Sequence, residues 1–226
     1  MKRFKYYIPL FIQSLFFIFF LPIYKFFIHL EIKGKDKLDK VKGPIIIASN
    51  HTSELDPTVI PLITAFFSEK LPVYSVIYPI IRYKQEDFGW RRYIYTGMFF
   101  ELLGGYPLKS GSKDYEKSLD NHIQLLNQGK TVCIFPEGRY TTDGKMSPAR
   151  GGLAYLAFKT KAVVVPIAIN TFYGLSIKDF ILRRKKVVVT VLDPINSDEI
   201  VENVNPSVEN FRLGSQKVLD KISEVL

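Results

Sequence analysis

The chain has 226 residues, a length that suits one α/β domain with a short appendage. Lys and Arg number 31 against 22 Asp and Glu, giving a net charge of +9. Such an excess favours an anionic partner (nucleic acid, anionic lipid or a phosphorylated substrate), although a solvated basic surface is the simpler explanation. Cys133 is the sole cysteine, so an internal disulfide is excluded and a buried thiol is expected. Three scattered His and no Cys cluster predict no metal site.

The N-terminal segment is apolar enough to interact with a bilayer. Residues 6–24 carry no charged side chain, a run close to the ~20 residues that cross a membrane. Basic residues flank the run on both sides, so the charge asymmetry of a simple span is missing. We favour a segment that lies in one leaflet, with both flanks on the anionic cytoplasmic face. A single span and a buried hairpin are the alternatives, whereas a signal peptide lacks its small-residue cleavage site.

Five short runs predict the strands of a sheet: residues 28–33, 44–49, 131–135, 162–169 and 187–192. The first alternates apolar and polar side chains, as in a half-buried strand. The second is apolar almost throughout, which is typical of a strand buried on both faces of a parallel sheet.

Helical patterns lie between these strands. Asp56-Pro57 is a favourable helix start, and we expect that helix to run to about residue 67. Residues 34–43 are predicted to be a charged loop, and His122 is expected at a helix surface. Further helices are predicted over residues 112–128, 152–160 and 207–226, with loops and a short helix over 72–81 and 88–100. The alternation predicts an α/β fold, with a largely parallel sheet flanked by helices and sites at the strands' carboxyl ends.

A His and an Asp follow the second predicted strand. His51 and Asp56 stand five positions apart and are joined by a strand-to-helix turn. The turn can fold the carboxylate onto one imidazole nitrogen, which leaves the other nitrogen to act as a general base. Alone, the pair is weak evidence for a catalytic site, because a chain with three His contains such a spacing by chance in about one case in seven. An N-cap Asp beside a loop His is the alternative.

A second polar segment follows the third predicted strand. In Phe135-Pro136-Glu137-Gly138-Arg139 a turn exposes one acid and one Arg, whose planar guanidinium suits a phosphate. Glu137 is suited to orient that Arg or to bond a substrate hydroxyl. A surface turn with a local ion pair is the alternative interpretation.

Together the two segments resemble the glycerolipid acyltransferases typified by 1-acylglycerol-3-phosphate acyltransferase. The family pattern is His-x4-Asp, usually after an Asn, then Phe-Pro-Glu-Gly and an apolar strand that ends in Pro. Residues 50–56, 135–139 and 163–166 match it in order and spacing, and the resemblance covers residues 28–195. It implies an acyltransferase domain over residues 28–226 and a membrane-associating segment over residues 1–27.

The resemblance also implies a mechanism. His51 takes a proton from the acceptor hydroxyl while Asp56 steadies the ring, and the oxygen attacks the thioester of acyl-CoA or acyl carrier protein. Backbone N–H groups would stabilise the oxyanion, and no cofactor is implied. The acceptor would be a lysophospholipid such as 1-acylglycerol-3-phosphate, at the cytoplasmic face of a membrane. Its phosphate would be held by Lys109, Glu137, Gly138 and Arg139.

Two positions depart from the common family pattern. Arg139 follows Gly138 directly, whereas the usual Arg stands two positions after the Gly. This variant resembles branches that act on other lysophospholipids. A further motif that usually ends in Arg ends here in Lys109, which offers phosphate a point charge without bidentate geometry.

Two other functions stay open at this point. A hydrolase would use His51 to activate water on the same acyl substrate. A non-catalytic binder of anionic membrane or nucleic acid would rely on the basic run at residues 183–186. The paired His51 and Asp56 favour the enzyme, so no nucleic acid partner is expected.

Overall fold

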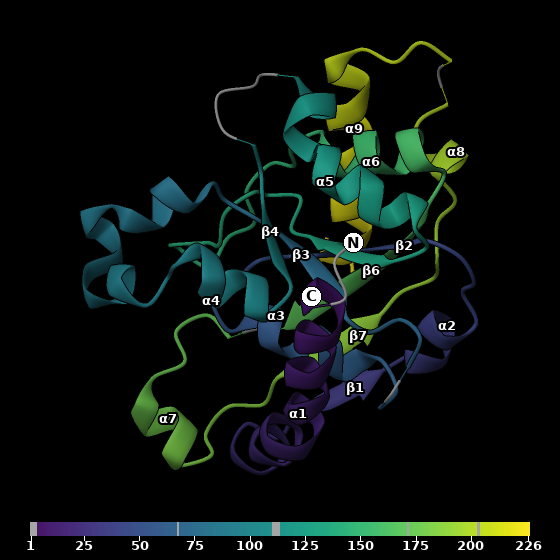
Figure 1. The fold of residues 1–226 in the computed structure, drawn as a ribbon. Helices are drawn as coiled ribbons and strands as arrows, with labels where there is room; N and C mark the ends of the chain where they lie inside the picture. Colours follow the sequence, from purple (N-terminus) through teal and green to yellow (C-terminus); the bar gives the residue numbers. More distant parts are fainter. Residues whose placement is uncertain (1–3, 67, 110–113, 171, 203) are drawn as a thin grey trace.

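The computed structural model describes residues 4–66, 68–109, 114–170, 172–202 and 204–226 (Figure 1). Within these ranges the strands are β1 (Glu31–Lys33), β2 (Ile45–Ser49), β3 (Val73–Ile77), β4 (Gly105–Pro107), β5 (Thr131–Ile134), β6 (Val163–Asn170) and β7 (Val188–Val191). The helices are α1 (Phe4–Phe27), α2 (Lys35–Asp39), α3 (Asp56–Val59), η1 (Pro61–Ile63), η2 (Ile80–Lys84), η3 (Glu86–Tyr93), α4 (Gly97–Leu102), α5 (Tyr115–Asn127), α6 (Gly152–Thr160), α7 (Ile177–Ile181), α8 (Ser197–Ile200) and α9 (Val208–Ser223).

The strands form one sheet in the order β1-β7-β6-β2-β5-β3-β4. Every neighbouring pair is parallel except β6 and β7, which are antiparallel. Helices α5, α6 and α9 cover one face, and α1, α2 and α3 cover the other (Figure 1). The α/β fold with a largely parallel sheet flanked by helices is therefore confirmed. The central strand β2 is buried at every position, as its apolar sequence predicts.

Several predicted boundaries are wrong for local reasons. The helix that begins at Asp56 ends at Val59, because Pro61 has no N–H to continue it and starts η1 instead. Residue 67, the expected end, lies outside the described residues. The predicted charged loop at 34–43 contains α2. The first strand begins only at Glu31, because α1 runs to Phe27 and His29 takes a left-handed φ of 46°.

Helix α1 lies along the domain for much of its length. The Gln13 side chain donates to the carbonyls of Val73 (2.8 Å) and Leu103 (2.9 Å) and accepts from Val73 N–H (2.8 Å). Near the C-terminal end of α1, the Tyr24 hydroxyl is 2.8 Å from the Thr58 hydroxyl. The polar groups of Gln13 and Tyr24 thus face the domain.

The opposite face of α1 is apolar and open to solvent. By length and composition, Tyr6–Phe27 is able to cross a membrane. The exposed large side chains on this helix are Tyr7, Phe11, Ile18, Phe19, Ile23 and Phe26. The boundary between a segment 1–27 and a domain 28–226 stays a prediction.

His122 is fully buried in α5, not at the helix surface as expected from the sequence. Its Nε2–H donates to the Tyr106 carbonyl (3.1 Å), while Nδ1 has no partner among the described residues. Burial lowers the pKa of His122 from 6.5 to about 4, because a charged imidazolium would lose its hydration there.

This burial predicts a pH dependence of stability. Between pH 6.5 and about 4 the unfolded chain binds a proton at His122 that the folded protein does not bind. The free energy of unfolding should therefore fall with decreasing pH, by about 3 kcal/mol over that window. Urea unfolding of wild type and His122→Gln at several pH values measures it. If the free energy of unfolding depended on pH in the same way for both proteins, His122 would not be the cause of the pH dependence.

Candidate active site

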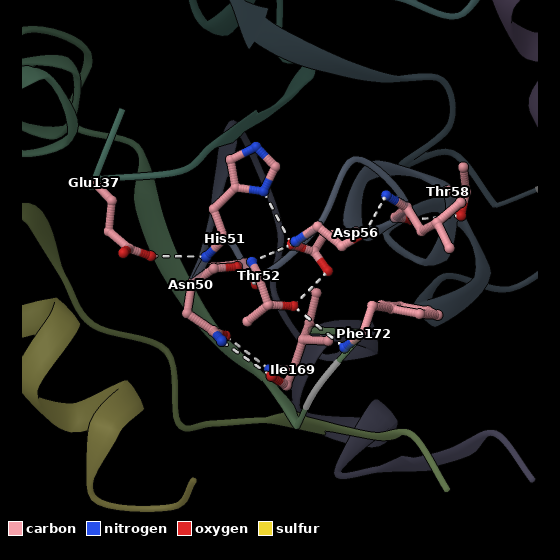
Figure 2. Close-up of polar contacts among 11 residues, drawn as sticks. Asn50, His51, Thr52, Asp56, Thr58, Glu137, Ile169 and Phe172 are labelled. Atoms are coloured by element: carbon pink, nitrogen blue, oxygen red, sulfur yellow. Dashed lines mark hydrogen bonds and ion pairs between the residues drawn. The ribbon is translucent and has the colours of Figure 1, made fainter. Parts of the chain in front are cut away.

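The site lies where two neighbouring parallel strands end. His51 follows β2 and Glu137 follows β5, and these strands pair directly in the sheet. The His51 N–H donates to Glu137 Oε1 (2.8 Å), as Figure 2 shows, and the His51 carbonyl accepts from Thr141 N–H (2.9 Å). The two predicted motifs therefore form one site, in which the backbone of His51 bonds to the Glu137 carboxylate and to the Thr141 N–H.

Asn50 fixes the first motif to the other neighbour of β2. Its side-chain oxygen accepts from Ile169 N–H (2.8 Å), and its amide donates to the Ile169 carbonyl (3.0 Å), in Figure 2 as paired dashed lines. This bidentate contact replaces the ladder bonds that end with β2, and it positions the turn that carries His51.

Asp56 holds the imidazole of His51. Its Oδ2 is 2.9 Å from His51 Nδ1 and also accepts the N–H groups of Thr52 (2.5 Å) and Ser53 (2.8 Å). Its Oδ1 accepts the Thr52 hydroxyl (3.0 Å). Because a fully buried carboxylate with these donors acts as an acceptor, the His51 proton resides on Nδ1. The lone pair on Nε2 is then available for a substrate proton.

Two aromatic side chains fix the plane of the imidazole. Phe135 stacks on the His51 ring with centroids 4.0 Å apart, and Tyr140 meets its edge at 5.8 Å. The His51 side chain is 15% exposed, so it is shielded but reachable. This arrangement suits a base that acts on a bound substrate while bulk water is largely excluded.

A cavity of about 630 Å³ adjoins His51. Helix α1 supplies Gln13, Phe16 and Phe20 to its wall, and β3 supplies apolar side chains. A cluster of rings between η2 and α4 forms another part of the lining: Tyr83, Phe88, Tyr95, Phe99 and Phe100. A largely apolar cavity of this size suits a hydrocarbon chain.

Glu54 ties this aromatic segment to the His51 loop. Its carboxylate accepts from the Arg91 guanidinium (2.6 Å) and from the Tyr95 hydroxyl (2.9 Å). Burial, reinforced by Glu54, raises the pKa of Tyr95 to about 12, so this hydroxyl stays a donor at neutral pH. Glu54 was not predicted as a site residue, although it lies between His51 and Asp56.

Two exposed arginines lie at the second motif. Arg139 and Arg150 both line the cavity, and neither has an ion-pair partner in the described part of the chain. Gly138 has a φ of 73°, and an added Cβ would lie 2.9 Å from Arg150 Cδ. Glycine therefore lets Arg150 lie across the turn. Arg150 was not predicted from the sequence, because it stands outside both motifs. Its backbone N–H donates to the Pro136 carbonyl (2.8 Å), which holds it beside the second motif.

The other two predicted phosphate ligands, Glu137 and Lys109, do not line this cavity, and both are engaged with other groups of the protein. Glu137 is only 2% exposed, and its second oxygen accepts from Ser147 N–H (2.7 Å), so both oxygens are engaged. Burial raises the pKa of Glu137, and the two N–H donors partly offset that rise. Lys109 pairs with Asp120 (2.5 Å) and is not among the cavity residues. Glu137 thus connects the loop after β5 to the loop that carries His51 through hydrogen bonds.

A buried carboxylate that orients an imidazole, at the carboxyl edge of a mostly parallel sheet, makes this an α/β protein whose site has the geometry that general-base chemistry needs. The family described as Acyltransferase matches residues 29–170, well over half of the chain. The chain belongs to the acyltransferase family, and the predicted family resemblance is confirmed.

Known relatives agree with this assignment. The chain is 30% identical to the chloroplastic 1-acyl-sn-glycerol-3-phosphate acyltransferase LPAT1 of Arabidopsis thaliana over 66% of this chain and 36% of that protein. It is 25% identical to the 1-acyl-sn-glycerol-3-phosphate acyltransferase of Saccharomyces cerevisiae, over 92% and 63% of the two chains. The chain thus spans between a third and two thirds of these relatives.

A solved structure shares the fold. The 1-acyl-sn-glycerophosphate acyltransferase PlsC of Thermotoga maritima superposes with a TM-score of 0.58. The two are 22% identical, and the match covers 87% of this chain and 72% of that one.

Proposed function

We propose that the protein is an O-acyltransferase that moves a fatty acyl group from a thioester to a hydroxyl of a lysophospholipid such as 1-acylglycerol-3-phosphate. One observation carries this proposal: the His51–Asp56 pair opens on an apolar cavity that is also lined by Arg139 and Arg150, two arginines without an ion-pair partner among the described residues. The cavity suits the acyl chain, the arginines suit a phosphate, and the imidazole suits a hydroxyl proton. The names of the relatives support the acceptor class.

The proposed reaction needs only groups of this chain and its two substrates. His51 Nε2 takes the acceptor's hydroxyl proton as the oxygen bonds to the thioester carbonyl carbon. The resulting tetrahedral intermediate expels the thiolate, which takes the proton from the imidazolium. Asp56 stabilises that imidazolium throughout. The thioester belongs to acyl-CoA or acyl carrier protein.

We place the enzyme on the anionic cytoplasmic face of a membrane, with α1 lying in one leaflet. The contacts of Gln13 and Tyr24 support the position of α1 in one leaflet, because they hold the helix along the domain. The exposed apolar face of α1 supplies the surface for lipid.

Product analysis tests the proposal. Purified protein is given each member of a lysophospholipid panel with acyl-CoA or with acyl carrier protein as the donor. The proposal expects a diacyl phospholipid, with lysophosphatidic acid among the accepted substrates. Release of free fatty acid alone would identify a hydrolase instead.

Removing the arginines should weaken the acceptor specifically. Arg139→Ala and Arg150→Ala should each raise the KM for the lysophospholipid by about tenfold, because each removes a charge-assisted hydrogen bond to phosphate. The KM for the thioester should change little. Steady-state kinetics with each substrate varied in turn measures this, and Lys109→Ala is the matched control, since Lys109 pairs with Asp120. A rise confined to the thioester's KM would reverse the assignment.

A further inference from the structure

The connection between β6 and β7 carries a short helix with two different faces. On α7, Ile177 is 81% exposed and Ile181 60% exposed, one helical turn apart. Phe180 faces inward and stacks on Phe27 with ring centroids 4.8 Å apart. A capping box between Ser176 and Asp179 begins the helix, so the exposed isoleucines sit on an ordered element.

Helix α7 is attached to the C-terminal end of α1, and the two lie next to each other in Figure 1. Arg183 makes the second attachment: its Nε donates to the Phe26 carbonyl (2.9 Å), and its guanidinium lies 4.3 Å from the Phe26 ring. The exposed Ile177 and Ile181 are therefore carried by a helix that packs against the end of α1 at which Phe26 is also exposed.

Positive charge borders this apolar surface. Residues 176–186 contain five basic side chains and one acidic side chain, Asp179, whose carboxylate is engaged in the capping box. Lys25 lies at the adjoining end of α1. Exposed aliphatic residues next to cations are the pattern of segments that insert at an anionic lipid surface.

We infer that α7 is a second membrane contact, at which Ile177 and Ile181 enter the head-group region of an anionic bilayer and the adjacent cations meet lipid phosphates. This inference rests on the proposed function for the presence of the enzyme at a bilayer. A single helix in one leaflet would let the domain rotate about the helix axis. A contact at α7 fixes that rotation, and with it the angle at which the cavity faces the lipid.

Vesicle co-sedimentation tests the contact with matched variants. Ile177→Ser/Ile181→Ser should weaken partitioning into phosphatidylcholine–phosphatidylglycerol vesicles by about tenfold. The control Val208→Ser/Leu213→Ser changes two aliphatic residues on α9 that are 53% and 55% exposed, and it should bind like wild type. Equal binding by the α7 variant, or no binding by wild type, would overturn the inference.

Site-specific labelling tests the same contact directly. Cys133 is fully buried and burial raises the pKa of its thiol, so a cysteine introduced at Ile177→Cys takes the label selectively. A polarity-sensitive fluorophore there should shift to the blue on vesicle binding, whereas one at Leu213→Cys should not. An unshifted label at 177 on vesicle-bound protein would place α7 in water. Transfer to detergent-dispersed acceptor reports the proposed function separately, because the α7 variant should retain it.

Discussion

Replacing His51 with alanine should lower the rate of acyl transfer by roughly 10³- to 10⁴-fold, because it removes the group that takes the hydroxyl proton. The fold should survive, since this side chain belongs to a turn and only its backbone atoms join the two motifs. Turnover at saturating concentrations of both substrates, together with a thermal unfolding curve, measures both statements. Turnover close to wild type in a folded His51→Ala protein would end the mechanism.

The Asp56→Asn substitution removes the negative charge of the carboxylate and keeps its geometry, so it measures what the charge contributes. The amide oxygen can keep the place of Oδ2 and its three N–H donors, while the amide nitrogen donates to the Thr52 hydroxyl. The ring then stays oriented but the imidazolium loses its counter-charge. We expect a loss of about 10²-fold in kcat, smaller than that of His51→Ala, because the N–H groups of Thr52 and Ser53 keep the amide oxygen, and with it the tautomer of the ring, in place. Losses as large as that of His51→Ala would mean that the ring is displaced.

Glu137→Gln should lower kcat by about 10²-fold with little change in the KM of the acceptor. Each Glu137 oxygen accepts one N–H, from His51 and from Ser147, and Gln offers a single acceptor. Its NH₂ group then faces an N–H donor, and a buried donor without a partner costs roughly 1–3 kcal/mol. The strain falls on the backbone of His51, which should displace the imidazole from its productive position.

The kcat and KM of both substrates, measured for Glu137→Gln and for a control, distinguish this role from phosphate binding. Glu116→Gln is the control, because Glu116 is exposed and pairs with Lys159 at the surface. If Glu137→Gln acts mainly by raising the KM of the lysophospholipid, Glu137 contacts the acceptor and its bonds to the two N–H groups are secondary.

Prediction from the sequence succeeded where the information is local. The strand β2 and the helix α6 depend on residues close in the chain, so apolar periodicity was enough. The contact between His51 and Asp56 is also local, but it was predicted through the family resemblance, because the spacing alone is weak evidence. The Phe-Pro-Glu-Gly segment was placed correctly in the loop after β5.

It failed where tertiary contacts decide. Arg150 belongs to the site because the Gly138 turn leaves room for it, a contact that no spacing rule reports. His122 has an ordinary helical position but lies under Tyr106, so its burial depends on how α5 packs. Glu137 was predicted to be the exposed acid of a turn, whereas it is buried and its two backbone partners come from separate loops.

The hydrogen bonds of Gln13 with Val73 and Leu103 matter to anyone who wants to make this protein more soluble in water. The helix that presents apolar side chains outward also supplies Gln13, Phe16 and Phe20 to the cavity wall. Trimming the N-terminus to improve solubility would therefore open the cavity and remove the partner of Val73 on β3. Polar substitutions confined to Phe11, Ile18 and Phe19 change the outward face alone and leave the cavity intact.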